Sequence, residues 1–162
     1  MREIQLPRGT VALVDDADYG RVIEAGPWHA ATRPLTETVY VQRHVPPTTQ
    51  YLHNFLTGLP YVDHRNGNGL DNQRANLRES THAQNMANSR RRKDNTSGFK
   101  GVSQERRTGR WVAQIQRGGH NFHLGTFGSP EDAARAYDAK AAELFGEFAR
   151  PNFPPAPKEL TL

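Results

Sequence analysis

A polar, glycine-broken stretch that begins at Asp63-His64 limits the possible folds more than any other part of the sequence. It ends at Asn76, and apolar residues flank it on both sides. We therefore expect a strand that ends at Asp63-His64, a polar loop, and then a helix. That helix should begin near Ser80 or Thr81, because either hydroxyl can accept a hydrogen bond from the free amides of a first helical turn. Turn formation alone accounts for Asn66, Asn68, Asp71 and Asn72.

Composition favours two small modules over one large core. The chain has 162 residues, of which 35% are apolar, and its mean hydropathy is −0.80. It contains no cysteine, so disulfides, zinc-thiolate sites and thiol nucleophiles are excluded. Any bound metal must therefore be held by oxygen and imidazole ligands.

The sequence contains no sign of a membrane protein. No apolar run approaches the roughly 18 to 20 residues that span a bilayer. The start of the chain also lacks the apolar region of a signal peptide. We expect a protein without membrane contact, located in the cytoplasm of a bacterial or phage-infected cell.

Positive charge is concentrated in one segment. Residues 89–120 hold nine Lys and Arg against two Asp and Glu, although the whole chain carries only +4. Such a block favours polyanion binding, because each phosphate that it neutralises releases condensed counterions. A solvated charge run without function is the alternative. The run at the head of this segment consists of Arg90, Arg91, Arg92 and Lys93.

The order of apolar and turn residues predicts an α+β protein. Short strands and a helix at 16–25 are expected in the first fifty residues. Later in the chain we expect three antiparallel strands at 99–102, 110–117 and 120–127, and then an amphipathic helix after Ser129-Pro130. The predicted parts are a β-rich extension (1–50), a chemistry-bearing module (51–88), a basic linker (89–97), a sheet-and-helix domain (98–154) and a tail (155–162).

The first of these motifs has the residue types that phosphodiester hydrolysis requires. The reaction needs a base for the attacking water and a cation for the charge that builds on the phosphate. His64 is the candidate base, because its unperturbed pKa lies near neutral pH. Asp63 and Asn85 are candidate oxygen ligands for one hard divalent cation. Asn76 is expected to bond to the loop backbone and hold the strand against the helix.

This motif resembles the HNH homing-endonuclease family of phages and bacteria. The matching segments are Leu52-His53, Val62–Asn68, Asp71–Arg78 and Thr81–Asn85. The resemblance implies a ββα-metal fold in which His64 is the general base, Asp63 and Asn85 bind one Mg²⁺ or Mn²⁺ ion, and Asn76 braces the loop. Asn54 stands where members often have Arg, so one possible phosphate contact is missing.

The last third of the chain resembles the Apetala/ethylene-response-factor DNA-binding domain of plant regulators. The matching segments are Ser97–Val102, Gly109–Ile115, His123–Phe127, Ala133–Asp138 and Asn152–Pro154. The resemblance implies a three-stranded sheet in the major groove of DNA, with outward side chains on bases and phosphates. The predicted DNA-contacting positions are Lys100, Ser103, Arg106, Arg107, Arg110, Gln114, Gln116, Asn121 and His123.

Several of these positions depart from the plant pattern. Ser103, Gln116, Asn121 and His123 stand where plant members usually have Arg or Trp, so the plant target sequence does not carry over. Trp111 has the opposite strand parity to Gln114, which predicts that it lies in the core under the helix.

Together these patterns predict a metal-dependent HNH endonuclease that nicks double-stranded DNA at a site chosen by its C-terminal domain. We expect it to work as a monomer, with Mg²⁺ or Mn²⁺ and no small-molecule cofactor. One alternative is a DNA-binding regulator with an inactive nuclease module. Another is an RNA-binding nuclease. It is less favoured because Trp111 and Phe122 have the strand parity of the inner sheet face, so the outer face lacks paired aromatic side chains on which RNA bases could stack.

Overall fold

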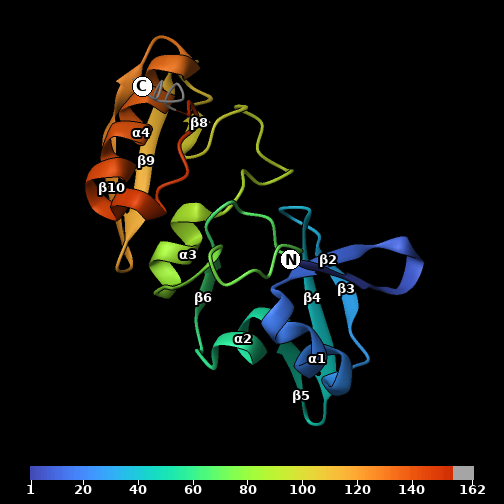
Figure 1. Ribbon diagram of the computed structural model, residues 1–162. Coiled ribbons are helices and arrows are strands. Elements are labelled where there is room, and N and C mark those ends of the chain that lie inside the picture. Colours follow the sequence, from blue (N-terminus) through green and yellow to red (C-terminus); the bar gives the residue numbers. More distant parts are fainter. Residues whose placement is uncertain (155–162) are drawn as a thin grey trace, which may run out of the picture. The chain divides into compact units, whose positions relative to one another are not determined.

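The computed structural model describes residues 1–154, in which the chain forms two compact units (Figure 1). The first unit runs from Met1 to Lys93 and the second begins at Asp94. Both mix helices with small antiparallel sheets, so the predicted α+β class is confirmed. The predicted tail lies outside the described residues. None of the helices in residues 1–154 has the length and apolar character that a membrane span requires.

The first unit opens with a strand pair and a helix. Strands β1 (Arg2–Gln5) and β2 (Val11–Val14) are antiparallel, with a short 3-10 turn between them, η1 (Pro7–Gly9). Helix α1 (Asp16–Ala25) follows over the predicted residues. Asp16 and Asp18 stand in its first turn, where negative charge is favoured by the helix dipole.

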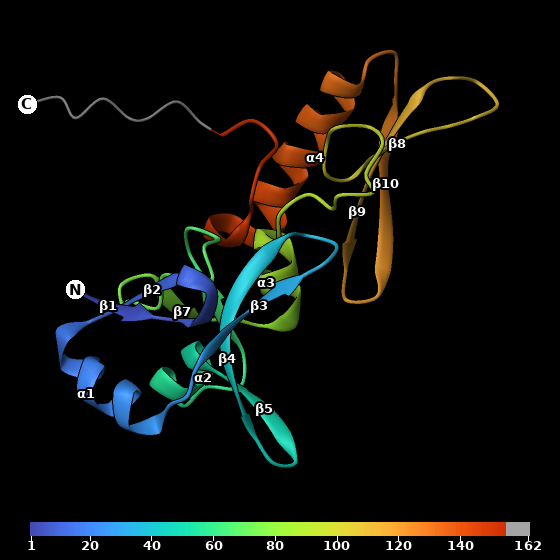
Figure 2. The same ribbon diagram turned by 90° about the vertical axis from the view of Figure 1, so that its right-hand side faces the viewer.

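A three-stranded sheet follows α1 (Figure 2). It consists of β3 (His29–Arg33), β4 (Thr38–Val45) and β5 (Thr48–Tyr51), with β4 in the centre. Strand β5 leads directly into helix α2 (Leu52–Thr57), which ends at Gly58 with φ at 74°. Glycine adopts this left-handed conformation without strain, and so it terminates the helix.

The segment singled out in the sequence forms a strand pair and a helix. Strands β6 (Val62–His64) and β7 (Leu77–Glu79) are antiparallel, and helix α3 (His82–Asn88) comes next. Thr81 caps α3 as predicted: its hydroxyl accepts from the backbone N–H of Gln84, and the Gln84 side chain accepts from the Thr81 N–H.

The polar loop between β6 and β7 is fixed on two sides. Leu13 of β2 donates its N–H to the Leu70 carbonyl at 2.8 Å and accepts the Asn72 N–H at 2.8 Å. On the other side Gly69 lies against β4, where a Cβ would come within 2.3 Å of the Val39 carbonyl oxygen. Only glycine allows this approach, so the loop rests directly on the sheet.

One apolar core holds the first unit together. It draws on β1, β2, α1 and β4 as well as on α2, β6 and β7, and no break separates the first fifty residues from the segment that follows. Its buried members are Ile4, Leu6, Ala12, Val14, Val22, Trp28, Val41, Leu52, Leu56, Val62 and Leu77.

The second unit is a three-stranded sheet with one helix across it. Strands β8 (Val102–Gln104), β9 (Trp111–Arg117) and β10 (His120–Phe127) lie in the order β10-β9-β8. Helix α4 (Pro130–Phe145) packs on one face of the sheet, and Ser129 caps its first turn. A short 3-10 turn, η2 (Gly146–Phe148), follows the helix. The core residues are Val102, Ala113, Ile115, Ala133, Ala134, Tyr137 and Ala141.

The prediction of a strand at 99–102 was wrong, since β8 begins at Val102. Gly98 and Gly101 have φ values of 82° and 75°, a left-handed conformation that does not continue a strand. At Gly101 a Cβ would also lie 1.9 Å from the Tyr137 ring. The chain therefore turns over α4 before it enters the sheet, and Phe99 packs against Phe153.

Candidate functional site

The Asp63-His64 pair is buried at the end of β6, where each residue is 4% exposed. Arg78 lies directly opposite Asp63 on β7. Its guanidinium donates to the Oδ2 atom of Asp63 from Nε at 2.9 Å and from Nη2 at 2.8 Å. A buried carboxylate is costly unless it is paired, and the Arg78 guanidinium is the partner that offsets this cost.

Asn88, the last residue of α3, makes further bonds to the same pair. Its Nδ2 donates to Asp63 Oδ1 at 2.9 Å, to Oδ2 at 3.0 Å and to the His64 carbonyl at 2.8 Å. Neither Arg78 nor Asn88 was predicted as a site residue from the sequence. The signals were present: Arg78 follows Asn76 by two residues, and Asn88 lies one helical turn beyond Asn85.

Asn85, the predicted metal ligand, is half-buried in the middle of α3, with its N–H bonded to the Thr81 carbonyl at 3.0 Å. Among the described residues, the amide side chain that contacts Asp63 is that of Asn88. Asn85 precedes it by three positions, so both lie on neighbouring turns of the same helix face. The ligand role of Asn85 stays a prediction.

The His64 ring is oriented by Asn72, which is fully buried. Its Nε2 lies 3.3 Å from the Oδ1 of Asn72, whose Nδ2 donates to the Gly69 carbonyl at 3.3 Å. Because this second bond uses the amide nitrogen, the oxygen faces His64 and needs a donor there. Nε2 therefore carries the hydrogen in neutral His64, and Nδ1 has the lone pair that accepts a proton.

Burial lowers the pKa of His64 below its usual value of 6.5. The hydrogen bond that His64 donates to Asn72 and the charges of Asp63 and Asp71 act in the opposite direction and raise this pKa. The imidazole is thus neutral near pH 7. A neutral imidazole is the form that a general base requires.

Asn76 connects two parts of the polar loop. Its Oδ1 accepts the Asn66 N–H at 3.0 Å, and its Nδ2 donates to the Asp71 carbonyl at 2.7 Å. These bonds close the loop on the strand that carries His64. Hydrogen bonds between the Asn76 side chain and the loop backbone are what the sequence led us to expect.

An aromatic cluster surrounds His64. The His53 ring meets it edge-on with centroids 5.0 Å apart, stacks on Tyr51 at 5.3 Å, and lies 5.8 Å from Tyr40. Within the described part of the chain, the Nδ1 atom of buried His53 has no hydrogen-bond partner. Burial, together with electrostatic interactions with His64 and Arg33, lowers the pKa of His53 to about 3. His53 is thus a neutral packing partner.

The Asp63 carboxylate is a ligand type that suits a hard divalent cation. Such ions prefer carboxylate, amide and water oxygens. Across residues 1–154 no three His, Asp or Glu side chains gather into a metal cage, so a site here would combine one carboxylate with amides. Among the described residues, Asp63 Oδ1 accepts only from Asn88, which leaves this oxygen with capacity for a further ligand.

The basic run lies along the first unit. Arg90 Nη2 approaches the Gly67 carbonyl at 3.4 Å. The Lys93 N–H donates to the Leu35 carbonyl at 2.7 Å, and its ammonium pairs with Glu37 at 2.9 Å. Arg91 and Arg92, between them, are exposed. The run is thus attached next to the polar loop and the β3–β4 turn.

In the second unit, the sheet face away from α4 carries exposed polar side chains. Gln114 is paired with His123, and Gln116 with Asn121, so each pair points to the same side. The other exposed candidates are Ser103 on β8, Arg106 and Arg107 in the β8–β9 loop, and Arg110, whose Nη2 donates to the Thr126 carbonyl at 3.0 Å.

Lys100 and Trp111 differ from these positions. Lys100 lies in the turn before β8 and is half-buried, and burial together with Arg150 lowers its pKa to about 8. Trp111 packs against the core on the α4 side, which confirms its predicted inward orientation.

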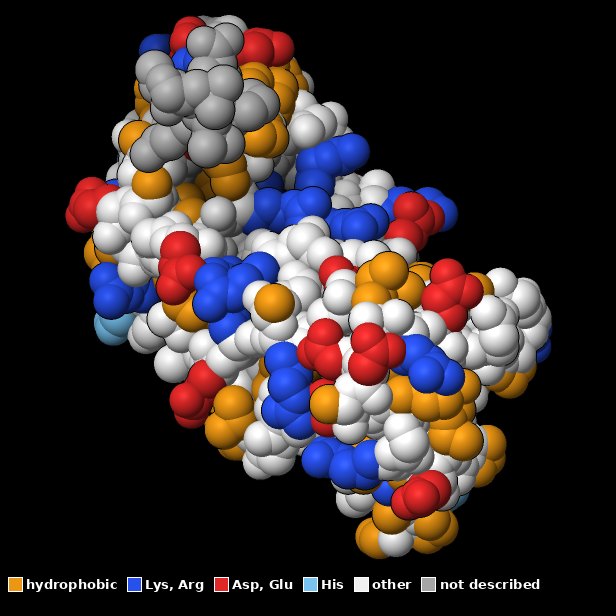
Figure 3. All heavy atoms as spheres, in the orientation of Figure 1, with side chains coloured by type: hydrophobic (Ala, Val, Ile, Leu, Met, Phe, Trp, Pro, Cys, Tyr) orange, Lys and Arg blue, Asp and Glu red, His pale blue; other side chains and the backbone are white. Residues whose placement is uncertain are grey.

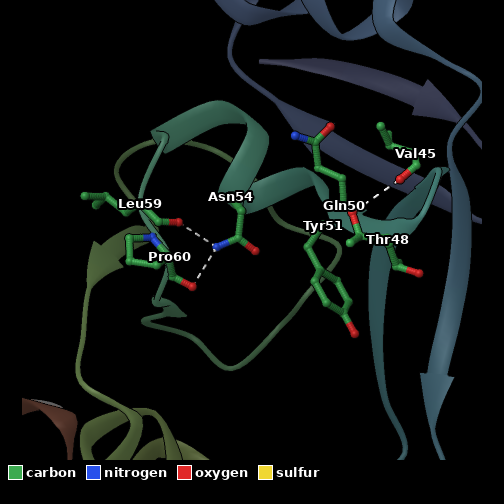
Figure 4. Close-up of a pocket in the computed structure, with 8 residues that line it drawn as sticks. Val45, Thr48, Gln50, Tyr51, Asn54, Leu59 and Pro60 are labelled. Carbon is green, nitrogen blue, oxygen red and sulfur yellow. Dashed lines mark hydrogen bonds between the residues drawn. The ribbon is translucent and has the colours of Figure 1, made fainter.

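Positive charge is not confined to the basic run. On the face drawn in Figure 3, Lys and Arg side chains reach the surface at several separate places. The first unit also has a shallow cavity of about 250 Å³ beside β5, with Tyr51 and Asn54 in its wall (Figure 4). Asn54 donates to the Leu59 and Pro60 carbonyls, which makes it a brace of the cavity wall.

Comparison with known proteins agrees with both resemblances. Residues 60–87 match the HNH endonuclease family, and residues 97–147 match the AP2 domain. An uncharacterized HNH endonuclease of Acanthamoeba polyphaga mimivirus is 38% identical over 92 residues, which is 57% of this chain and 46% of the relative.

Plant transcription factors are also similar to part of this chain. An ethylene-responsive factor of Medicago truncatula is 40% identical over 86 residues, 52% of this chain and 32% of its own length. One from Arabidopsis thaliana is 53% identical over 70 residues, 40% of this chain and 27% of its own length. This chain thus spans less than half of each of these relatives, and no solved structure matches it. The chain combines an HNH segment with an AP2-like domain.

Proposed function

We propose that the chain is a metal-dependent HNH endonuclease that nicks double-stranded DNA. The observation that carries this proposal is the fixed Asp63-His64 pair. Its carboxylate is held by Arg78 and Asn88, and its imidazole is oriented by Asn72 with Nδ1 free to accept a proton. The match of residues 60–87 to HNH endonucleases supports the same reading.

His64 acts as the general base. Its Nδ1 takes a proton from the water that attacks the phosphorus atom, and the ring becomes an imidazolium. The Oδ1 of Asn72 accepts from Nε2–H throughout, which favours the correct tautomer and stabilises the charged ring. Asn76 keeps the loop closed, so that the His64 ring and its partner Asn72 stay in place.

Asp63 and Asn85 are the residues that would hold one divalent cation, Mg²⁺ or Mn²⁺. When bound, such an ion supplies positive charge for the phosphate and the leaving oxygen. The Asn88 amide and the Arg78 guanidinium keep the Asp63 carboxylate in one orientation. We propose no small-molecule cofactor.

The AP2-like domain selects the DNA site. Its exposed sheet face has Gln114, Gln116, Asn121 and His123 in cross-strand pairs, and such side chains can bond base edges in the major groove. Arg106, Arg107 and Arg110 add phosphate contacts, as do Arg90 to Lys93 of the basic run. Linkage to this domain raises the local concentration of the nuclease on DNA, so that a monomer needs no tight binding by the nuclease itself.

Chemical rescue tests the role of His64. A His64→Gly variant should fail to nick supercoiled plasmid in Mg²⁺, and added imidazole should restore nicking, because the free base replaces the missing ring. The matched control is His82→Gly at an exposed histidine on α3, which should nick without imidazole. Duplex binding by His64→Gly without any rescue would instead favour the regulator.

A further inference from the structure

The β3–β4 hairpin closes one side of the candidate site, although no site residue was predicted on it from the sequence. Tyr40 of β4 lies against both histidines, with its ring centroid 5.8 Å from His64 and 5.8 Å from His53. A Cβ on Gly69 would be 2.7 Å from the Tyr40 ring, so the polar loop touches this side chain directly. Residues on this hairpin are therefore neighbours of the reacting groups.

Arg33, at the end of β3, extends this wall with a positive charge. Its Cζ atom lies 5.5 Å from the centre of the Tyr40 ring, within the range of a cation–π contact. The side chain is exposed, and no carboxylate in residues 1–154 pairs with it. Tyr40 thus holds a guanidinium near His64 without neutralising it.

Arg90 brings a second guanidinium to the polar loop from another segment. It is exposed, it approaches the Gly67 carbonyl of the polar loop, and its charge acts on Tyr40 together with that of Arg33. The bond from Lys93 N–H to the Leu35 carbonyl fixes the basic run to the turn that follows Arg33. One arginine therefore contacts Tyr40, which lies against the candidate base, and the other contacts the polar loop that touches Tyr40.

We propose that Arg33, seated on Tyr40, forms with Arg90 a clamp for the backbone phosphates of the DNA strand that is cut. An arginine presents a planar fork of donors that matches a phosphate, and stacking on an aromatic ring limits its motion. The clamp places the strand next to His64 and takes no part in proton transfer. This inference rests on the proposed nuclease function.

The salt dependence of DNA binding tests the clamp without any cleavage. Binding of a fluorescein-labelled duplex of mixed sequence would be measured in EDTA over a range of NaCl concentrations. Each phosphate contact contributes about 0.9 to the slope of log K against log salt. Arg33→Gln should reduce this slope by about one contact, and Arg33→Gln with Arg90→Gln by about two.

Arg2→Gln is the matched control. Arg2 is also an exposed arginine over a tyrosine, with its Cζ 4.3 Å from the Tyr19 ring, but it stands on β1 with no histidine in that contact. This variant should keep the wild-type slope. An Arg33→Gln slope equal to that of wild type and of Arg2→Gln would overturn the clamp.

Nicking of supercoiled plasmid by the same variants separates the clamp from the nuclease. If wild type nicks, Arg33→Gln should nick at least about tenfold more slowly when saturating enzyme is used, a loss of about 1.4 kcal/mol in transition-state stabilisation. A reduced slope in a chain that never nicks would support the phosphate contact and contradict the proposed function. If wild type nicks, and Arg33→Gln has the wild-type slope and the wild-type nicking rate, the nuclease function would be supported and the clamp would be contradicted.

Discussion

The two units place their polar residues in opposite ways. In the first unit Asp63, His64 and Asn72 are buried, and every one of them is bonded to another protein group. In the second unit the polar residues with a proposed role, such as Gln114 and Gln116, are exposed on a sheet whose other face carries the core. The first arrangement suits chemistry in a fixed geometry, and the second suits contact with a large partner.

This difference predicts how the units tolerate substitution. In the first unit the groups proposed for catalysis also satisfy one another's buried charges and hydrogen bonds, so function and stability are coupled. In the second unit the proposed contacts can be removed without leaving a buried group unpaired. The predictions below test this contrast.

The largest effect should come from Arg78→Ala. It leaves the buried Asp63 carboxylate without its ion pair, which should lower the free energy of unfolding by about 3 to 5 kcal/mol. Denaturant unfolding measures the change. Arg110→Ala, at an exposed arginine in the second unit, is the control and should stay within about 0.5 kcal/mol of wild type. Equal effects of the two variants would remove the contrast between the units.

Asn72 should control the pH dependence of nicking. In wild type the low pKa of His64 should place the acid limb of the rate profile below pH 6.5, because the base is active when neutral. Asn72→Asp keeps the acceptor and adds a negative charge, which favours the imidazolium, so the acid limb should move to higher pH.

Asn72→Ala should instead slow nicking roughly ten- to a hundredfold, a range typical of residues that orient a functional imidazole. Asn68→Ala, in the same loop but exposed, should leave the profile unchanged. An acid limb that does not move in Asn72→Asp would show that Asn72 does not act through His64.

Gln114→Ala should separate binding from folding. Loss of one base contact should weaken duplex binding by about 1 to 3 kcal/mol, and the free energy of unfolding should not change. Arg110→Ala should also weaken binding, and both variants should nick bound DNA at the wild-type rate. Fluorescence anisotropy and single-turnover nicking measure the two quantities. Unchanged binding in both variants would mean that this sheet face does not contact DNA.

His53 should make the stability of the first unit depend on pH. Its folded pKa is about 3 against 6.5 in the unfolded chain, so between these values the unfolded state binds more protons. Stability should be fully present above pH 6.5 and should fall as the pH drops below it, by up to about 1.4 kcal/mol per pH unit. His53→Phe should show a weaker dependence in denaturant titrations. An identical slope in both proteins would contradict this assignment.

Local sequence signals predicted the elements well. The helix at Asp16–Ala25 was predicted from its apolar pattern, and the helix after Ser129 from its cap and apolar spacing. The cap at Thr81 was predicted from its hydroxyl. These features depend on neighbouring residues. The start of β8 was misplaced because the conformation of Gly101 is set by Tyr137, which is distant in the sequence.

The contacts of the candidate site were less predictable. Asp63 and His64 were found from their own residue types, but the partners Arg78 and Asn88 depend on strand register and on the angle of α3. The approach of Tyr40 to His64 depends on how β4 and β6 pack, and these strands are distant in the sequence and meet through the apolar core. Spacing along one chain does not contain this information.

The most direct test of the proposed nuclease is a supercoiled-plasmid assay with Mg²⁺, Mn²⁺ or EDTA, run on wild type beside His64→Ala. Wild type should convert the plasmid to open circles with either metal and not in EDTA. His64→Ala should fail to nick while its duplex affinity stays within about a few-fold of wild type, because the base contributes little to ground-state binding. Metal-dependent nicking by His64→Ala at the wild-type rate, or no nicking by wild type that still binds duplex, would contradict the account.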